Sequence, residues 1–361
     1  MRASGEEAPP ESDRFEPAPH PRDTGALFGH RKAEAELLQA YRANRLPQAF
    51  ILGGPVGIGK ATLAWRLARF LAAHPDPASP EVLRAHDLGV DPAHPVARKI
   101  SSMAFGDLAL LRRGWNEKTK KFFTRIAVED VRKMLRLFEQ AAAGGGWRMA
   151  IVDSADDLNA SGANALLKMI EEPPPKSLFL LVAHQPGRLL PTIHSRCRRV
   201  MLQPLGDGDL RDATRAACAA GGLTADAARM EAACEKAGGA PREALRLLSA
   251  ADAGFDAQVM RALALLPRID WPLVHAIADR AAGNETAFDA LLAAAFGWLS
   301  AALKARRALG ARAVAPYAEA WEQLERDARE LAIFNLDKRA FTVIAFDLLS
   351  QKAQAAEREQ A

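Results

Sequence analysis

The sequence predicts an α/β domain built on a parallel sheet and followed by an all-helical remainder. Three short apolar runs, at 49–52, 149–153 and 178–183, alternate with segments of helical spacing. Because these runs are continuously apolar, we expect buried parallel strands covered by helices on both faces. A glycine-rich loop follows the first run, and no strand pattern is found after Pro204.

The helical segments follow from apolar residues that recur every three or four positions. Glycines at 144–146 and prolines at 173–175 end two of them. A short break at Ala251–Gly254 indicates a hinge between two helical groups. The predicted helices are 33–41, 63–71, 128–143 and 163–170.

Composition bounds the class of protein. The chain has 361 residues, 49% hydrophobic and 25% charged, which is enough for two or three packed domains. Its net charge of +4 permits contact with nucleic acid but does not indicate a dedicated nucleic-acid-binding domain. The three cysteines form no C-x-x-C pair, so we expect neither a disulfide framework nor a cysteine zinc site.

The chain lacks the sequence features of membrane insertion and secretion. No stretch approaches the roughly 18 to 20 uncharged apolar residues of a membrane span. Residues 1–23 carry acidic residues and prolines where a signal peptide needs an apolar run. We therefore expect a cytoplasmic protein, with residues 1–24 as a flexible leader.

The glycine loop Gly54-Pro55-Val56-Gly57-Ile58-Gly59-Lys60 has the pattern of a phosphate cradle. In a G-x-x-x-x-G-K-[ST] loop, backbone N–H groups surround the phosphates and the lysine contacts their charge. Gly54, Gly57, Gly59 and Lys60 are therefore candidate nucleotide-binding residues. The alternative is a tight glycine turn that only lets the helix pack on the sheet.

The position that should supply a hydroxyl to Mg²⁺ is occupied by Ala61. Thr62 is a candidate contact, but it lies one residue later, about 100° around the helix from the required direction. We expect ATP or ADP binding to remain possible, and Mg²⁺ binding to be weak.

Asp153 ends the second predicted strand, where an aspartate can support Mg²⁺ and a following glutamate can orient the attacking water. Ser154 occupies the glutamate position. Asp156 and Asp157 come too late to replace it, and the alternative for them is a helix N-cap cluster.

Two further motifs resemble a known family. Asn164–Pro174 reads NALLKMIEEPP, and Pro191–Cys197 reads PTIHSRC. Together with the spacing to the glycine loop, they resemble the clamp-loader branch of the AAA+ ATPases over about residues 25–250. This resemblance implies an AAA+ nucleotide-binding domain at 25–204 with an insertion at about 75–126, a small helical lid at 205–251, and an all-α collar domain for oligomerisation at 252–361.

The resemblance also assigns roles to two arginines. Arg196, in Ser195-Arg196-Cys197, would act in trans as an arginine finger toward the ATP of a neighbouring subunit; otherwise it belongs to a solvated basic edge. Arg242 matches the sensor-2 arginine that faces nucleotide in the same chain, and the alternative is a surface arginine at a helix start. His184-Gln185 replaces the short polar residues expected at sensor 1.

The family often carries a four-cysteine zinc module, but the insertion here has no cysteine, so we expect no zinc and no metal-ligating site residues. His74, His86 and His94 lack a metal-binding spacing and are expected at the surface. The basic, aromatic stretch Arg112–Arg125 could contact DNA or be a solvated face.

The resemblance implies a non-motor subunit of the bacterial sliding-clamp loader within the DNA polymerase III holoenzyme, with little or no ATPase of its own. Its partners would be the motor subunits and the delta subunit in a hetero-pentamer. The sliding clamp and primer-template DNA would be met through the assembly, and no membrane is expected. The first alternative is the ATP-hydrolysing motor subunit of the same loader. The second, which explains fewer of the motifs, is a P-loop small-molecule kinase.

Overall fold

The computed structural model describes residues 9–16, 18–139, 145–307, 310–334 and 336–358. It divides into two compact units, Met1–Arg246 and Leu247–Ala361, which are treated separately. The boundary lies within helix α10 (Pro241–Leu248). The sequence placed it after residue 251, a few residues further along the chain.

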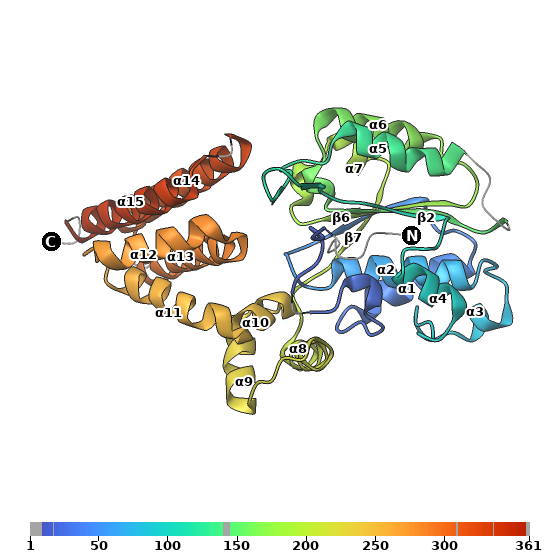
Figure 1. Cartoon of the computed structure of the whole chain (residues 1–361), viewed down its shortest axis with the longest axis horizontal. Coiled ribbons are helices and arrows are strands. Elements are labelled where there is room, and N and C mark those ends of the chain that lie inside the picture. Colours follow the sequence, from blue (N-terminus) through green and yellow to red (C-terminus); the bar gives the residue numbers. More distant parts are fainter. Residues whose placement is uncertain (1–8, 17, 140–144, 308–309, 335, 359–361) are drawn as a thin grey trace. The chain divides into compact units, whose positions relative to one another are not determined.

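The first unit is built on a five-stranded sheet in the order β2-β5-β6-β1-β7 (Figure 1). Every neighbouring pair in this sheet is parallel. The carboxyl ends of all its strands therefore lie at one edge, where ligands of open α/β sheets bind. The strands are β1 (Ala49–Gly53), β2 (Leu108–Leu111), β5 (Arg148–Asp153), β6 (Ser177–Ala183) and β7 (Arg198–Met201).

The sheet is buried on both faces, because alternate residues of its central strands enter different hydrophobic clusters. In β1, Phe50 and Leu52 belong to one cluster, whereas Ala49 and Ile51 belong to the other. β5 and β6 divide in the same way. The predicted fold class, a helix-covered parallel sheet, is confirmed.

Two groups of helices cover the sheet (Figure 1). α2 packs on β1, β5 and β6, with α1 and α4 nearby, whereas α5 and α6 pack together on the opposite face. The helices of this part of the chain, two of them short (α3 and α7), are α1 (Arg31–Arg42), α2 (Lys60–Ala73), α3 (Pro80–Arg84), α4 (Pro95–Ser101), α5 (Val128–Leu135), α6 (Ala160–Glu171) and α7 (Pro191–His194).

The structure contains elements that the sequence reading missed. The predicted insertion at 75–126 includes β2, which is the edge strand beside β5. It also includes a separate two-stranded hairpin, β3 (Trp115–Asn116) with β4 (Lys121–Phe122). The predicted helix at 128–143 is α5 followed by a 3₁₀ turn, Arg136–Glu139, and residues 140–143 lie outside the described residues.

The segment expected to be a flexible leader packs on the first unit over its described residues. Its 3₁₀ turn, Pro21–Asp23, contacts α2 and α4. The His20 ring is 1% exposed and meets the Trp65 ring edge-on at 6.0 Å. Paired charges hold this segment, and a reading based on apolar periodicity does not detect them.

Three helices follow the sheet in the range predicted as a lid, and they are called the lid below. They are α8 (Asp207–Gly221), α9 (Ala227–Lys236) and α10, with a small core that includes Leu210, Cys234 and Ala244. Gly239 connects it to the end of the sheet domain. Its φ is +79°, and an added Cβ would lie 2.6 Å from Pro204 and 2.8 Å from the Leu205 carbonyl oxygen. Only glycine fits there without rearrangement.

The described residues of the second unit form helices and the short connections between them, as predicted for the C-terminal region. Its core includes Phe255, Ile277, Leu299 and Phe346. The hinge expected at Ala251–Gly254 is instead part of a helix. The helices are α11 (Ala250–Ala264), α12 (Trp271–Gly283), α13 (Glu285–Arg306), α14 (Ala311–Phe334) and α15 (Lys338–Arg358).

Within α13, Ala287–Arg306 is long and apolar enough to cross a membrane, with a mean hydropathy of 1.3. This segment carries Asp289 and supplies Leu291 and Leu299 to the core of the second unit. The core helix of a soluble protein passes the same test, so this is weak evidence for a membrane span.

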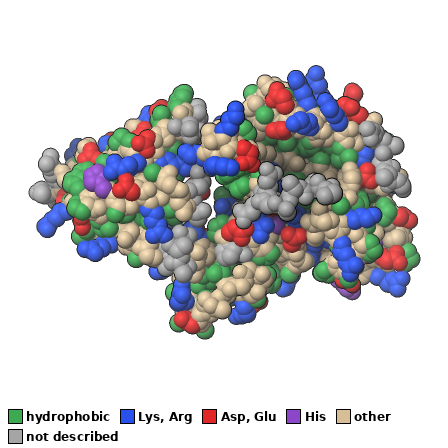
Figure 2. Space-filling view, in the orientation of Figure 1, with side chains coloured by type: hydrophobic (Ala, Val, Ile, Leu, Met, Phe, Trp, Pro, Cys, Tyr) green, Lys and Arg blue, Asp and Glu red, His purple; other side chains and the backbone are tan. Residues whose placement is uncertain are grey.

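Acidic and basic side chains are interspersed on the face shown in Figure 2.

The three cysteines, Cys197, Cys218 and Cys234, are all free and buried, at 8%, 3% and 7% exposure. The structure thus places no cysteine thiol at the surface.

Candidate nucleotide site

The glycine loop joins β1 to α2 and has the backbone of a phosphate cradle. Gly54, Gly57 and Gly59 have φ angles of +143°, +78° and +105°, a region that favours glycine. An added Cβ on Gly54 would lie 2.5 Å from the Leu202 carbonyl oxygen. The loop ends at the N-terminus of α2, whose N-cap makes no side-chain hydrogen bond. The backbone therefore fits an anionic ligand at this helix end.

His30 supports the loop from outside the motif. Its Nε2 lies 2.6 Å from the Ile58 carbonyl oxygen, and the residue is 7% exposed. The sequence reading missed this residue. A lone histidine before a helix gives no local signal, because the contact joins residues 28 positions apart.

Lys60 is turned onto its own loop. The Nζ donates to the carbonyl oxygens of Gly54, at 2.7 Å, and Pro55, at 2.5 Å. The residue is 3% exposed, and burial lowers its pKa to about 8, against the opposing effect of Asp153 and Asp156. A phosphate would have to compete with these carbonyl groups for the ammonium.

The first turn of α2 contains Ala61 where a metal-binding hydroxyl would lie, and the methyl group packs against the core on that face of the sheet. Thr62 follows it and is partly buried. Successive helical side chains diverge by about 100°, so Thr62 cannot point where Ala61 points. The loop fits phosphate better than it fits Mg²⁺.

Asp153 lies at the carboxyl end of β5, next to β6 and on the same sheet edge as the glycine loop. Burial raises its pKa to about 7, and the carboxylate of Asp13 adds to the shift, while Lys60 opposes it. A carboxyl that is half-protonated near neutral pH is a weak magnesium ligand. This electrostatic setting matches the lost hydroxyl at Ala61.

Ser154 and the aspartates after it have structural partners. The Ser154 hydroxyl donates to Asp157 Oδ2 at 3.1 Å, and Asp157 also pairs with Arg113 at 3.3 Å. Asp156 accepts the backbone N–H groups of His184 and Gln185, the latter at 3.0 Å. Asp156 therefore joins the segment after β5 to the end of β6. Asp156 and Asp157 lie in a 3₁₀ turn, Ala155–Asp157, and neither caps α6, whose N-cap is Asn159.

His184, at the sensor-1 position, is partly buried next to this sheet edge. Burial lowers its pKa to about 3, and the positive charges of Lys60 and Arg242 contribute. The imidazole is therefore neutral at physiological pH.

Arg242 is brought to the glycine loop by the lid. Its backbone N–H donates to the Gly57 carbonyl oxygen at 3.4 Å, and an added Cβ on Gly57 would lie 2.5 Å from the Arg242 Cβ. The guanidinium carbon lies 4.8 Å from the centroid of the Phe15 ring. The predicted Gly54, Gly57, Gly59, Lys60, Asp153 and Arg242 thus gather at one edge of the sheet.

Arg196 is separate from this group. Its Nε pairs with Glu171 at 2.8 Å, and its NH1 contacts the Thr192 carbonyl oxygen at 3.2 Å and the Ser195 hydroxyl at 3.0 Å. These partners come from α6 and α7. The Arg196 side chain is 38% exposed, so its guanidinium is held in place and remains accessible from outside the chain.

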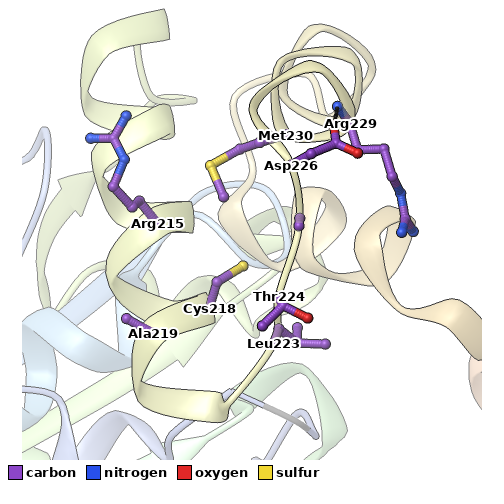
Figure 3. A pocket seen from close by; sticks show the side chains of 9 residues that line it. Arg215, Cys218, Ala219, Leu223, Thr224, Asp226, Arg229 and Met230 are labelled. Carbon is purple, nitrogen blue, oxygen red and sulfur yellow. Dashed lines mark hydrogen bonds between the residues drawn. The ribbon is translucent and has the colours of Figure 1, made fainter.

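A shallow groove between α8 and α9 is a different feature (Figure 3). Its volume is about 580 Å³, with Cys218 and Met230 among its lining and Arg215 and Arg229 beside them. None of the predicted site residues lines it. Within the described ranges, no three His, Cys, Asp or Glu side chains are grouped to hold a metal ion.

Three features define a P-loop module: a glycine cradle between the first strand and its helix, an aspartate ending a neighbouring parallel strand, and an arginine contributed by a helix after the sheet. Residues 29–206 match the family model described as DNA polymerase III, delta subunit. Over this stretch, which is just under half of the chain, the sequence is similar to clamp-loader subunits of this kind.

The relatives agree with this assignment. The DNA polymerase III subunit delta' of Pseudomonas aeruginosa is 37% identical over 152 residues, covering 41% of each chain. The DNA polymerase III subunit gamma/tau of Mycobacterium tuberculosis is 30% identical over 271 residues, covering 74% of this chain and 44% of that protein. The sequence interpretation as a clamp-loader subunit of the delta-prime type is confirmed at the level of family.

This chain spans less than half the length of these curated relatives. A solved structure, a DNA polymerase III gamma subunit-related protein from Thermotoga maritima, is 17% identical, with a TM-score of 0.42 over 88% of this chain and 99% of that one.

Proposed function

We propose that the chain is a non-motor subunit of the bacterial sliding-clamp loader, and that it supplies Arg196 in trans to the ATP site of a neighbouring motor subunit. The partners would be the motor subunits and the delta subunit in a hetero-pentamer. The sliding clamp and primer-template DNA would be reached through that assembly. Replication takes place in the bacterial cytoplasm, which is the proposed location.

The observation that carries the proposal is the placement of Arg196. Its guanidinium is accessible and oriented by Glu171, and its partners lie outside the glycine loop of its own chain. A guanidinium brought to a γ-phosphate stabilises the charge of the transition state and is worth about 10³ to 10⁵ in rate. The Glu171 contact would keep the arginine extended before a neighbour binds.

The site of the chain itself supports a role without turnover. Ala61 has no hydroxyl for Mg²⁺, Ser154 has no carboxylate to orient water, and Lys60 is bonded to its own loop. A motor subunit of the same loader, which is the second candidate, would need the first two groups. A P-loop small-molecule kinase would leave Arg196 and the helical second unit without a role.

The test is the DNA- and clamp-stimulated ATPase of the reconstituted complex. Arg196→Ala should lower kcat by at least about 100-fold while leaving assembly intact. Arg199→Ala is the matched control, because Arg199 is also exposed and lies only three residues away on β7. It should leave kcat within about two-fold of the parent value.

Equal activity of the Arg196→Ala and Arg199→Ala complexes would refute the finger assignment. Magnesium-dependent ATP turnover by the isolated chain, abolished by Lys60→Ala, would favour the motor alternative. Phosphoryl transfer to a nucleoside monophosphate would favour the kinase alternative.

A further inference from the structure

The N-terminal segment Glu11–Glu16, called the strap below, is fixed by ion pairs at the edge of the sheet that carries the glycine loop. Glu11 accepts from Arg22 at 2.8 and 3.0 Å and from Arg112 at 2.8 Å. Asp13 accepts from Arg112 at 2.5 Å and lies 3.0 Å from His20 Nε2. The Asp13 side chain is only 1% exposed.

These anchors place the strap beside the nucleotide site. Arg112 directly follows β2, which pairs with β5, and Asp153 is the last residue of β5. The strap also donates from the Ser12 hydroxyl to the Arg113 carbonyl oxygen at 3.0 Å. It therefore lies along the carboxyl ends of β2 and β5, where phosphates bind in this class of fold.

The other end of the strap reaches the lid. The Phe15 ring lies under the Arg242 guanidinium at 4.8 Å, and the Arg242 backbone is bonded to Gly57 of the glycine loop. One face of the guanidinium that would meet a phosphate is thereby covered by an aromatic ring. The contact joins residues 227 positions apart, so chain proximity does not explain it.

The strap carries carboxylates, which have the same sign of charge as the phosphates of a nucleotide and repel them. Asp13, which Arg112 and His20 hold in place, is near enough to Asp153 to raise the pKa of that carboxyl, at an edge whose cationic groups include Lys60, Arg242 and Arg113. Phosphates entering here would meet these carboxylates and would need the guanidinium that Phe15 covers.

We propose that the strap is an intramolecular competitor of nucleotide, which closes the glycine-loop site until it is displaced from Arg242 and Asp153. The inference goes beyond the proposed function: it rests on the glycine loop being a nucleotide site and does not rest on Arg196. Nucleotide affinity should then be limited by the fraction of molecules in which the strap is open.

The first experiment measures ADP affinity by calorimetry on the full-length chain without Mg²⁺. Phe15→Ala removes the aromatic cover but none of the ion pairs, and it should tighten ADP binding by about five-fold. Phe123→Ala is the matched control, because that ring is 51% exposed on the segment after the β3–β4 hairpin. It should leave the affinity unchanged.

The second experiment follows backbone hydrogen exchange of residues 11–16 in the parent chain, with and without saturating ADP. We expect the backbone amides of the strap to exchange faster when nucleotide is bound, because the nucleotide and the strap exclude one another. Thermal unfolding of each variant checks that Phe15→Ala retains the parent fold.

Equal ADP affinities of the parent and Phe15→Ala chains, or strap exchange that is unchanged or slowed by ADP, would overturn the proposal. Failure of every variant to bind ADP at millimolar concentration would also overturn it. That last outcome would leave the Arg196 assignment standing, since the reconstituted ATPase tests it independently.

Discussion

The buried ion pair between Glu34 of α1 and Arg66 of α2 should be a main support of the first unit. Arg66 donates from Nε to Glu34 Oε1 at 2.8 Å, and its NH2 lies 2.8 Å from the same oxygen. That oxygen also accepts the Leu88 N–H at 3.1 Å. The side chains are only 6% and 8% exposed. Glu34→Ala would leave a buried guanidinium and a buried N–H without this acceptor.

The expected loss can be estimated from the contacts that remain. Removing one partner of a buried pair costs about 3 to 5 kcal/mol. Arg66 would keep Asp87, 3.6 Å away on the surface, and its bond to the Gly25 carbonyl oxygen. We therefore expect about 3 kcal/mol, at the lower end, which is a large part of the about 5 to 15 kcal/mol that stabilises a typical domain.

Urea unfolding followed by circular dichroism would measure this loss. With an m-value of about 2 kcal/mol/M, the transition of the first unit should move down by about 1.5 M. The double variant Glu34→Leu/Arg66→Met should recover most of the loss, because an apolar pair leaves no buried charge. A single-variant loss below about 1 kcal/mol, or a double variant no more stable than the single, would refute the reasoning.

Two further predictions concern Asp153 and the second unit. Burial and Asp13 raise the folded-state pKa of Asp153 to about 7, so the ionised carboxylate destabilises the fold above that pH, and the penalty disappears as pH falls below the unfolded value near 3.8. Asp153→Asn should therefore stabilise the chain by a few kcal/mol at pH 8 and by progressively less toward pH 4, as read from urea midpoints; a pH-independent difference would contradict this. Leu299→Ala, at a position that is 0% exposed on α13, should cost about 2 to 5 kcal/mol in the transition of the second unit only. An equal shift in both transitions would contradict the separation into units.

The central strands were predictable because a strand that is buried on both faces has a continuous run of apolar residues. β1, β5 and β6 are continuous apolar runs, and each of them was expected. The edge strand β7 (Arg198–Met201) begins with two exposed arginines and has no such run. β2 is short and follows a proline-rich stretch, so its pairing with β5 depends on the tertiary fold and not on local pattern.

The same distinction separates the predictable from the unpredictable parts of the site. The glycine loop is a contiguous motif, and its backbone geometry follows from Gly54, Gly57 and Gly59. The packing of His30 on the loop and of Phe15 on Arg242 joins residues far apart in sequence. Neither contact has a local signature, and the mixed charges around Phe15 predicted disorder where the structure has ion pairs.

The burial of all three native thiols has a practical consequence. Burial raises the pKa of Cys197 to about 12 and also raises that of Cys218, so for Cys197 only about one molecule in 100,000 carries the nucleophilic thiolate at pH 7. Maleimide dyes should therefore react slowly with Cys197. Thr192→Cys, an exposed position beside Arg196, should be labelled faster than that buried thiol, and its fluorescence would report the docking of a neighbour.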